Sequence, residues 1–208
     1  MGLLRKFFSN TGKPEGVMGR IVVAMMNRGH AAVAAWGFSH LDLCGDEHVL
    51  DCGCGGGANI AVFLRMVDEG YVTGLDYSSV SVDKAREVNH AAIAAGRCEI
   101  VQGNVLELPF DDGRFDVVTA FETVYFWPEI ARCFVEIYRV LKPGGMFMIT
   151  NETSGKTGSH EKWVKIVDNM SVYTGEELES LLTNAGFARV EIDEDLKADR
   201  LNVRAYKA

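Results

Sequence analysis

The sequence predicts an α/β fold with a parallel sheet at its centre. Short apolar runs alternate with segments of helical periodicity along most of the 208 residues, an order of elements typical of parallel sheets with helical crossovers. A glycine-rich turn at residues 53–57 joins the first of these runs to a helical segment. Two further runs, at residues 188–192 and 202–206, are expected to pair as an antiparallel hairpin at the sheet edge.

Length and composition indicate one domain with a substantial core. Hydrophobic residues make up 48% of the chain and charged residues 24%, and the net charge is −8. A nucleic-acid-binding surface would normally be basic, so the charge argues against a general nucleic-acid partner without excluding a small local RNA contact. A small-molecule partner is expected instead, and a monomer or a homodimer is equally compatible with the composition.

The segment before the first strand is expected to form an arm and a helix. Residues 1–16 have the composition of a loosely ordered arm, and Val17–Phe38 is rich in Ala and Met. Because Met is adaptable, this helix is either a lid over a ligand pocket or a permanently packed helix. Three polar residues interrupt its apolar character, so no membrane span is expected; they are Arg20, Arg28 and His30.

Cysteine usage and the lack of a recognisable signal peptide predict a cytoplasmic protein. The 5 cysteines are odd in number and fall mostly in predicted strands and helices, so we expect them to be reduced and buried. Cys52 and Cys54 have no second ligand pair at a suitable spacing, and no metal site is expected.

The first strand and its glycine turn predict a ligand-binding loop. Val49 and Leu50 end a run suited to a buried parallel strand, and Ala58–Val67 follows the turn as a helix. Glycines allow backbone amides to approach a ligand closely, although such a turn can also serve only to pack a helix against a strand. The glycine spacing alone also fits the fingerprint of dinucleotide-binding enzymes.

Asp51 favours one ligand class over the other. It stands two residues before the first glycine, at the strand end where ligands bind. A carboxylate there would repel a pyrophosphate and attract a ligand carrying an ammonium and a sulfonium group. S-adenosylmethionine is such a ligand.

The second strand candidate, Tyr71–Asp76, also ends in an acid. Asp76 follows the glycines by the roughly 20 residues at which an acidic side chain binds ribose hydroxyls. Ser78 or Ser79 can cap the following helix, which is expected to end near Gly96. Its inward-facing positions would be Val82, Ala85, Val88 and Ala92.

The remaining elements follow in order. Cys98–Gln102 and Phe115–Phe121 are strand candidates, and the second is nearly continuous in apolar and β-branched residues. Pro128 suits the first position of a helix that reaches Leu141, with Met146–Thr150 as the next strand. Residues 151–159 are expected to be a mobile loop. Thr174 and Glu177 form a capping-box signal for a helix that closes at Gly186.

Five motifs in this order resemble class I S-adenosylmethionine-dependent methyltransferases, of the group that includes ubiquinone/menaquinone-pathway and other small-molecule methylases. The motifs are Leu50–Gly57, Gly74–Asp76, Gln102–Asn104 with Leu108–Phe110, Phe115–Val118 and Arg139–Gly145. The resemblance implies a Rossmann-like seven-stranded sheet in the order 3-2-1-4-5-7-6, with strand 7 antiparallel and helices on both faces. It further implies a core domain at residues 45–208, preceded by an N-terminal arm and helical lid at residues 1–44.

The resemblance also implies where S-adenosylmethionine would bind. Asp51, Gly53, Cys54, Gly55 and Gly57 would surround its amino-acid end. Asp76 would hold the ribose hydroxyls and Tyr77 would lie against the adenine. Asn104, which replaces the acid common in the family, and Val105 would meet the adenine edge, and Phe121 and Glu122 would line the floor below the methyl donor.

The reaction implied is an in-line methyl transfer to a small molecule, helped by alignment and exclusion of water. A general base is needed only if the acceptor is protonated, and the candidates are Glu122, Tyr125, His160 and Tyr173. Tyr125, Phe126 and Trp127 would either clamp an acceptor or belong to the core. Two alternatives stay open, a non-catalytic S-adenosylmethionine-binding or assembly subunit and, with less support, an NAD-dependent oxidoreductase.

Overall fold

The computed structural model describes residues 31–165, 167 and 170–208. Its strands are β1 (His48–Cys52), β2 (Tyr71–Asp76), β3 (Cys98–Gln102), β4 (Phe115–Phe121), β5 (Leu141–Asn151), β6 (Arg189–Asp195) and β7 (Arg200–Tyr206). Its helices are α3 (Ala31–Phe38), α4 (Ala58–Met66), α5 (Ser79–Val88), α6 (His90–Ala94), η1 (Val124–Phe126), α7 (Ile130–Val140), α8 (Glu161–Val164) and α9 (Gly175–Asn184).

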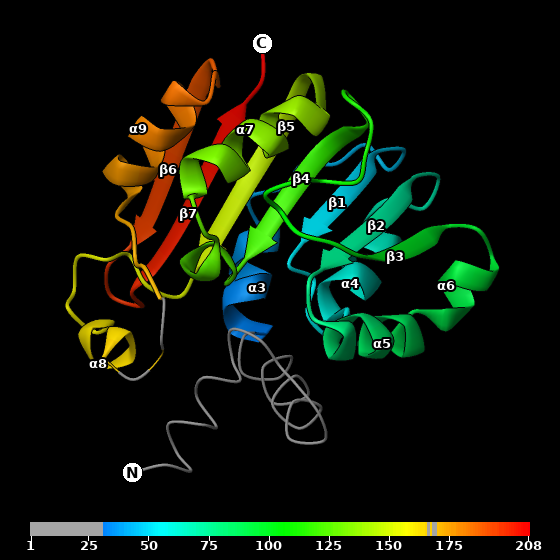
Figure 1. The fold of residues 1–208 in the computed structure, drawn as a ribbon, viewed down its shortest axis with the longest axis horizontal. Coiled ribbons are helices and arrows are strands. Elements are labelled where there is room, and N and C mark those ends of the chain that lie inside the picture. Colours follow the sequence, from blue (N-terminus) through cyan, green and yellow to red (C-terminus); the bar gives the residue numbers. More distant parts are fainter. Residues whose placement is uncertain (1–30, 166, 168–169) are drawn as a thin grey trace.

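The strands form a seven-stranded sheet in the order β3-β2-β1-β4-β5-β7-β6 (Figure 1). Strands β1 to β5 pair in parallel, and β7 runs antiparallel to both β5 and β6. This confirms the predicted topology and the C-terminal hairpin. The carboxyl ends of the parallel strands therefore meet along one edge, at the lower side of the sheet in Figure 1.

Helices cover both faces of the sheet, as predicted. One face packs against α3, α4 and α5, through buried residues that include Ala34, Phe63 and Val82. The other face packs against α7 and α9, through Phe134, Ile137 and Leu178. Both faces of a parallel sheet must be buried in this way, because its strands are apolar on both sides.

Two predicted boundaries around β5 were wrong. Helix α7 begins at Ile130, two residues after Pro128, and ends at Val140. Strand β5 begins at Leu141, because Leu141 pairs with Phe115 before the register becomes irregular. The Pro-Gly-Gly segment thus lies within the strand, at a bulge rather than in a turn before it.

The predicted helix after β2 is divided in two at Asn89. The Asn89 side-chain amide donates hydrogen bonds to the Gly57 and Ala85 carbonyl oxygens, both at 3.0 Å. Asn89 is the C-cap of α5 and the N-cap of α6. Val88, expected to face inward, is 42% exposed, and the neighbouring Asn89 is buried instead.

Most of the expected N-terminal lid lies outside the described residues. Its last part, α3, packs against the sheet. A Cβ atom on Gly37 would lie 2.6 Å from both Phe121 Cε1 and Thr150 Oγ1. The Phe38 ring contacts those of Phe63 and Phe121, with centroids 5.0 Å apart in each pair. The end of this segment is therefore in close contact with the carboxyl ends of β4 and β5.

The segment 151–159, expected to be mobile, makes specific contacts with the turn between β6 and β7. Asp199 Oδ1 accepts hydrogen bonds from Ser154 N at 3.0 Å and Ser154 Oγ at 2.7 Å. Its Oδ2 accepts from Thr157 Oγ1 at 2.7 Å and from Ser159 Oγ. These four bonds lower the pKa of Asp199 despite the opposing effect of burial, so the carboxyl remains charged.

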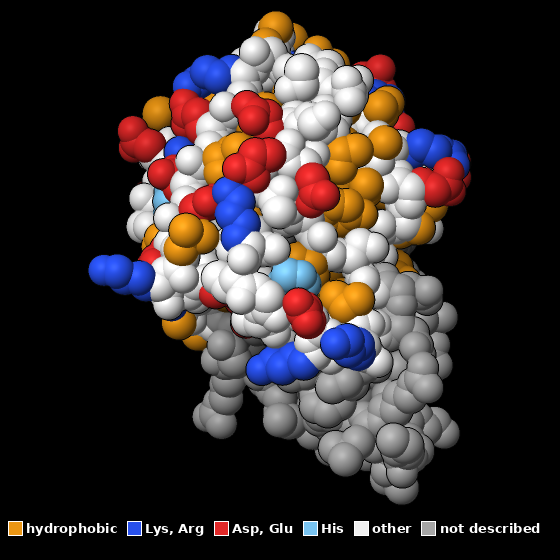
Figure 2. Space-filling view, turned by 90° about the vertical axis from the view of Figure 1, so that its left-hand side faces the viewer, with side chains coloured by type: hydrophobic (Ala, Val, Ile, Leu, Met, Phe, Trp, Pro, Cys, Tyr) orange, Lys and Arg blue, Asp and Glu red, His pale blue; other side chains and the backbone are white. Residues whose placement is uncertain are grey.

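Charged side chains occupy the open edge of the sheet at β6. Arg204 pairs with Glu191 at 3.2 Å and Asp193 at 2.6 Å, and Arg189 pairs with Glu191. Figure 2 shows acidic and basic side chains side by side on this side of the molecule. Charged residues on an edge strand discourage pairing with a strand of another chain.

The described helices are all too short or too polar to cross a bilayer. Of the cysteines, Cys44 is exposed, which corrects the expectation that all are buried, and the other four are buried; none of them is paired. Across the same described residues, no group of three or more His, Cys, Asp or Glu side chains could hold a metal ion.

Candidate functional site

A cavity of about 730 Å³ lies at the carboxyl ends of β1, β2 and β4. Its wall combines the glycine loop after β1, the residues that follow β2, β3 and β4, and the start of α3. In open parallel sheets, ligands bind outside the carboxyl ends of the strands where the strand order reverses, which here is between β1 and β4. The size is that of a small-molecule site.

The glycine loop is shaped by residues with positive φ. Gly53 has φ of 83° and Gly55 φ of 51°, a region that costs other residues energy. A Cβ on Gly53 would come within 2.5 Å of Thr123 Cγ2, so Gly53 allows the loop to pack against the segment after β4. A Cβ on Gly55 would meet no atom within 4 Å, so this backbone faces open space.

Gly57 has a different role from the one expected. It is the N-cap of α4 with φ of 76°, and a Cβ there would lie 2.9 Å from Ala85 Cα. It does not line the cavity. Gly57 therefore allows α4 and α5 to approach each other.

Asp76 connects the glycine loop to the start of α5. Its Oδ2 accepts a hydrogen bond from Gly55 N at 2.9 Å, and its Oδ1 accepts one from Ser78 N at 2.9 Å. The side chain lines the cavity and the residue is 7% exposed. Burial raises the pKa of Asp76, an effect that the bonds from Ser78 and Gly55 oppose.

Asp51 does not line the cavity, contrary to the expectation that it surrounds the ligand. Its Oδ1 accepts a hydrogen bond from Thr119 Oγ1 at 3.0 Å on the neighbouring strand β4. Its Oδ2 is buried without a hydrogen-bond partner among the described residues. The pKa of Asp51 is raised to about 7. Burial is the largest cause, the bond from Thr119 opposes it, and the charge of Asp76 adds to it. Asp51 is thus only partly charged near neutral pH.

The segments after β2 and β3 form the far wall of the cavity. Tyr77 is 44% exposed and Val105 is 7% exposed. Asn104 also lines the cavity and is exposed. Its Oδ1 accepts a hydrogen bond from Leu106 N at 3.1 Å, so the side chain also shapes the turn after β3.

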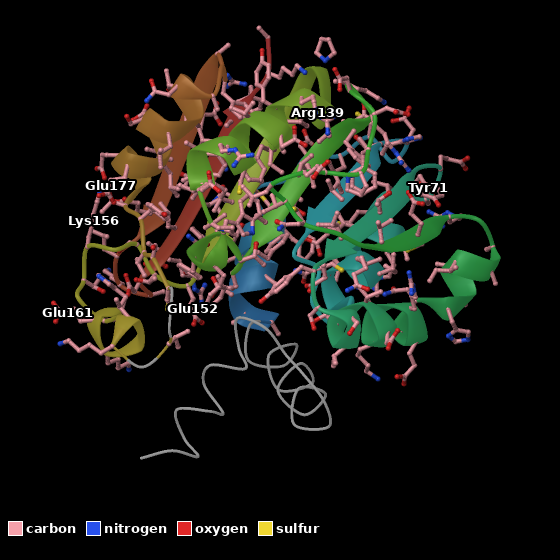
Figure 3. All side chains as sticks on the ribbon, in the orientation of Figure 1. Tyr71, Arg139, Glu152, Lys156, Glu161 and Glu177 are labelled. Atoms are coloured by element: carbon pink, nitrogen blue, oxygen red, sulfur yellow. The ribbon has the colours of Figure 1, made fainter. Side chains whose placement is uncertain are left out.

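The end of β4 contributes Phe121 and Glu122, which both line the cavity and are each 7% exposed. Glu122 has a positive φ of 60°. Its backbone N–H donates to Thr150 O at 2.9 Å, and its Oε1 accepts from Glu152 N. Figure 3 labels Glu152 at this end of the sheet, near α8. Burial, followed by the charge of Glu152, raises the pKa of Glu122 well above its usual value.

The four candidate bases separate into two pairs. Glu122 and Tyr173 line the cavity, whereas Tyr125 and His160 do not. The Tyr125 hydroxyl and His160 Nδ1 are buried without hydrogen-bond partners among the described residues. Burial and the charges of Glu122 and Glu152 raise the pKa of Tyr125, so it is a poor base at neutral pH.

The segment after β4 contributes further lining residues, among them two of the three aromatic residues considered as a clamp on an acceptor. Phe126 and Trp127 line the cavity, and the Trp127 ring also stacks on Phe147 with centroids 6.1 Å apart. Thr123 donates from Oγ1 to Cys52 O at 3.2 Å and thereby holds the segment after β4 against the glycine loop. Ala31, Val33 and Ala34 line the cavity from the segment considered as a lid, and lining residues that sequence reasoning did not single out include Asn59, Ser81, Glu129 and Ser171.

The charge of the cavity suits S-adenosylmethionine. Three carboxyl side chains, Asp76, Glu122 and Glu129, line it, and its described lining includes no Lys, Arg or His. Such a wall favours a ligand with sulfonium and ammonium groups and opposes the two charges of a pyrophosphate. The open space at Gly55 lets such a ligand approach the backbone. Three acids other than Asp51 therefore give the cavity wall its preference for a cationic ligand.

Comparisons with known proteins agree with this geometry. Residues 50–149 match the family described as "Methyltransferase domain". Cycloartenol-C-24-methyltransferase 1 of Oryza sativa subsp. japonica is 37% identical over 101 residues, 49% of this chain and 29% of that protein. Demethylmenaquinone methyltransferase of Lactiplantibacillus plantarum is 37% identical over 117 residues, 56% of this chain and 49% of that one. The chain thus spans less than half the length of these relatives.

Among solved structures, a Haloferax volcanii methyltransferase in complex with the Trm112 methyltransferase activator superposes with a TM-score of 0.77. The match covers 90% of this chain and 93% of that one at 23% identity. At this identity the likeness concerns the fold.

The raised pKa of Asp51 predicts how stability changes with pH. Between about pH 4 and pH 7 the folded protein retains a proton that the unfolded chain releases, so the free energy of unfolding contributed by Asp51 falls as pH rises. Asp51→Asn removes the free-energy cost of ionising this buried carboxyl and keeps an oxygen that can accept the bond from Thr119. We expect the variant to be more stable than the parent above about pH 7, by at most about 4 kcal/mol, and to match it near pH 4.

Urea denaturation across this pH range measures the difference. Asp46→Asn, which removes the same charge from an exposed position, is the control. A gap between Asp51→Asn and the parent that stays constant with pH would contradict the assignment of the raised pKa to Asp51.

Proposed function

We propose that the protein transfers a methyl group from S-adenosylmethionine to a small-molecule acceptor, starting from the match of residues 50–149 to the family described as a methyltransferase domain. The main support for this proposal is that one cavity combines the glycine loop, the Asp76 carboxyl and an aromatic wall. The first two suit a nucleoside-containing cation, and the third suits an apolar acceptor beside it.

The proposal gives the lining residues separate roles toward the cofactor. Gly53, Cys54 and Gly55 lie along its amino-acid end, and Asp76 accepts hydrogen bonds from its ribose hydroxyls. The adenine lies beside Tyr77, Asn104 and Val105. This assignment is supported by the position of all three residues in the cavity wall. Phe121 and Glu122 lie below the reacting centre.

The bound cofactor supplies an electrophilic methyl group, so the chain contributes mainly alignment and a dry environment. Phe121, Phe126 and Trp127 present aromatic surface that excludes water from the reacting atoms. Glu122 and Tyr173 are the candidate bases that line the cavity, and we propose no role in proton transfer for Tyr125 or His160.

An acceptor with an apolar body fits this wall. The relatives named above act on cycloartenol and on demethylmenaquinone, and we extend only the chemical class of small molecule to this chain. Nucleic acid is not proposed as a partner, because the net charge of −8 opposes it. The unpaired described cysteines accord with a cytoplasmic enzyme.

Calorimetric titration with S-adenosylmethionine, S-adenosylhomocysteine and NAD tests the proposal against its alternatives. We expect both sulfur ligands to bind and NAD to show no saturable binding, because the acidic wall repels its pyrophosphate. Saturable NAD binding that neither sulfur ligand displaces would favour an oxidoreductase. Cofactor binding without turnover on a broad metabolite panel would favour a non-catalytic binding subunit.

Removing the Asp76 carboxyl should weaken cofactor binding. Hydrogen bonds to a charged group contribute about 1.5–3 kcal/mol, so Asp76→Ala should raise the dissociation constant of S-adenosylhomocysteine roughly tenfold to more than a hundredfold. Asp76→Asn keeps one acceptor oxygen and should lose less. Asp111→Ala, an exposed acid outside the cavity, is the control for net charge. An unchanged constant in folded Asp76→Ala would mean that the ribose is held elsewhere.

Two substitutions at Asn104 separate adenine binding from turn formation. Asn104→Asp retains an oxygen for Leu106 N and for an adenine amine, so affinity should change by less than about tenfold, or about 1.4 kcal/mol. Asn104→Leu removes that oxygen and should cost more, about 1–3 kcal/mol, by leaving an adenine donor unpaired. Calorimetry and thermal unfolding are measured on the same variants. A lower melting temperature with unchanged affinity in Asn104→Leu would limit the side chain to the turn.

A further inference from the structure

Glu122 is a buried carboxyl that lacks a cationic partner among the described residues. It lines the cavity, and the residue is 7% exposed. No ion pair within the described chain includes it, whereas Glu129, another acid of the wall, pairs with Arg132 at 2.9 Å. A charged, buried carboxyl without a cationic partner is unfavourable, because it loses its hydration without gaining a compensating charge.

The backbone fixes Glu122 in this position. Three described non-glycine residues have positive φ, and two of them, Glu122 and Glu129, are in the cavity wall. Two bonds hold Glu122: its N–H donates to Thr150 O in β5, and its Oε1 accepts from the N–H of Glu152, the residue after β5. Strained conformations persist where the surrounding structure enforces them, and they are concentrated at functional sites.

The surroundings of Glu122 are aromatic and acidic. Phe121, Phe126, Trp127 and Tyr173 line the same cavity, and no Lys, Arg or His occurs in its described lining. Aromatic faces attract cations, and a carboxyl pairs with them. An anionic acceptor would find no positive side chain in this described lining. Both oxygens of Asp76 already accept backbone hydrogen bonds, whereas only Oε1 of Glu122 does. Glu122 is therefore the carboxyl that we assign to the acceptor.

We propose that the acceptor is an amine with an aromatic or apolar body, and that Glu122 binds its nitrogen. The proposal rests on the methyltransferase function proposed above and specifies its substrate class. The ammonium form of the amine pairs with Glu122 while the aromatic side chains contact the body of the molecule. Of the other two carboxyls in the described wall, Glu129 pairs with Arg132 and Asp76 binds the backbone of the glycine loop.

Methyl transfer to an amine also requires a proton acceptor. The ammonium transfers one proton to the Glu122 carboxylate, and the freed nitrogen lone pair forms a bond to the methyl carbon. The carbon–sulfur bond breaks with its electron pair remaining on sulfur, which leaves S-adenosylhomocysteine and a methylated ammonium. The raised pKa of Glu122 brings it closer to that of an amine and eases this transfer.

The test compares three probes of similar shape on the S-adenosylhomocysteine complex by calorimetry at neutral pH. They are 2-phenylethylamine as a cation, 2-phenylethanol as a neutral molecule and phenylacetate as an anion. We expect the cation to bind at least about tenfold tighter than the alcohol, and the anion to bind weakest. Glu122→Gln should abolish the preference for the cation while S-adenosylhomocysteine still binds. Glu179→Gln, which removes an equal charge from the exposed face of α9, should retain it.

The outcomes separate this proposal from the one on which it rests. Binding of the cation no tighter than the alcohol, including no detectable binding of either, overturns the amine assignment and leaves the cofactor proposal intact. A cation preference that persists in Glu122→Gln overturns the role of Glu122. Failure of S-adenosylhomocysteine to bind the unaltered protein overturns the methyltransferase function itself.

Discussion

The contact between Asp76 and the glycine loop is the interaction on which the site depends. Asp76 ends β2, and its two oxygens accept hydrogen bonds from Gly55 N and Ser78 N. One carboxyl therefore positions the loop after β1 and the first turn of α5 together. Strand β2 can lie this close to α4 because Gly74 has no side chain: a Cβ there would come within 2.3 Å of Ile60 Cδ1. A glycine inside β2 is thus as important to the site as those in the loop.

Burying carboxyls at neighbouring strand ends, in the cavity wall and behind it, costs stability that other contacts must offset. The pKa values of Asp51, Asp76 and Glu122 are all raised, and burial is the largest cause for each. A cationic ligand would relieve this cost, because it favours the charged form of each nearby acid. The site is in this sense complementary to a positive charge before any ligand binds, and a cationic cofactor should stabilise the fold by mass action.

The start of the described chain contributes to the cavity and lies outside the residues that match the methyltransferase family. The family match begins at residue 50, whereas Ala31, Val33 and Ala34 already line the cavity. Phe38 connects α3 to Phe121 at the end of β4 through a ring contact. The cavity therefore includes residues contributed from outside the matched part of the chain.

The sequence by itself determined the α/β class, every strand of the sheet and the acid at the end of β2. These follow from local periodicity, from the glycine turn and from the meeting of parallel strand ends at one edge. The capping box at Thr174 and Glu177 was predicted correctly for the same reason, since its partners are three residues apart. The strand order, by contrast, came from the resemblance of motifs rather than from periodicity.

Tertiary structure alone decided where the side chains at the strand ends point. Asp51 faces Thr119 because β4 lies beside β1, and the two residues are 68 positions apart in the chain. Asn89 divides a helix because it bonds to Gly57, 32 positions away. Glu122 is fixed by Thr150 in β5 and by Glu152 just after it, and Phe126 rather than Tyr125 lines the cavity. Each outcome depends on a partner that is distant in sequence, and periodicity carries no information about such partners.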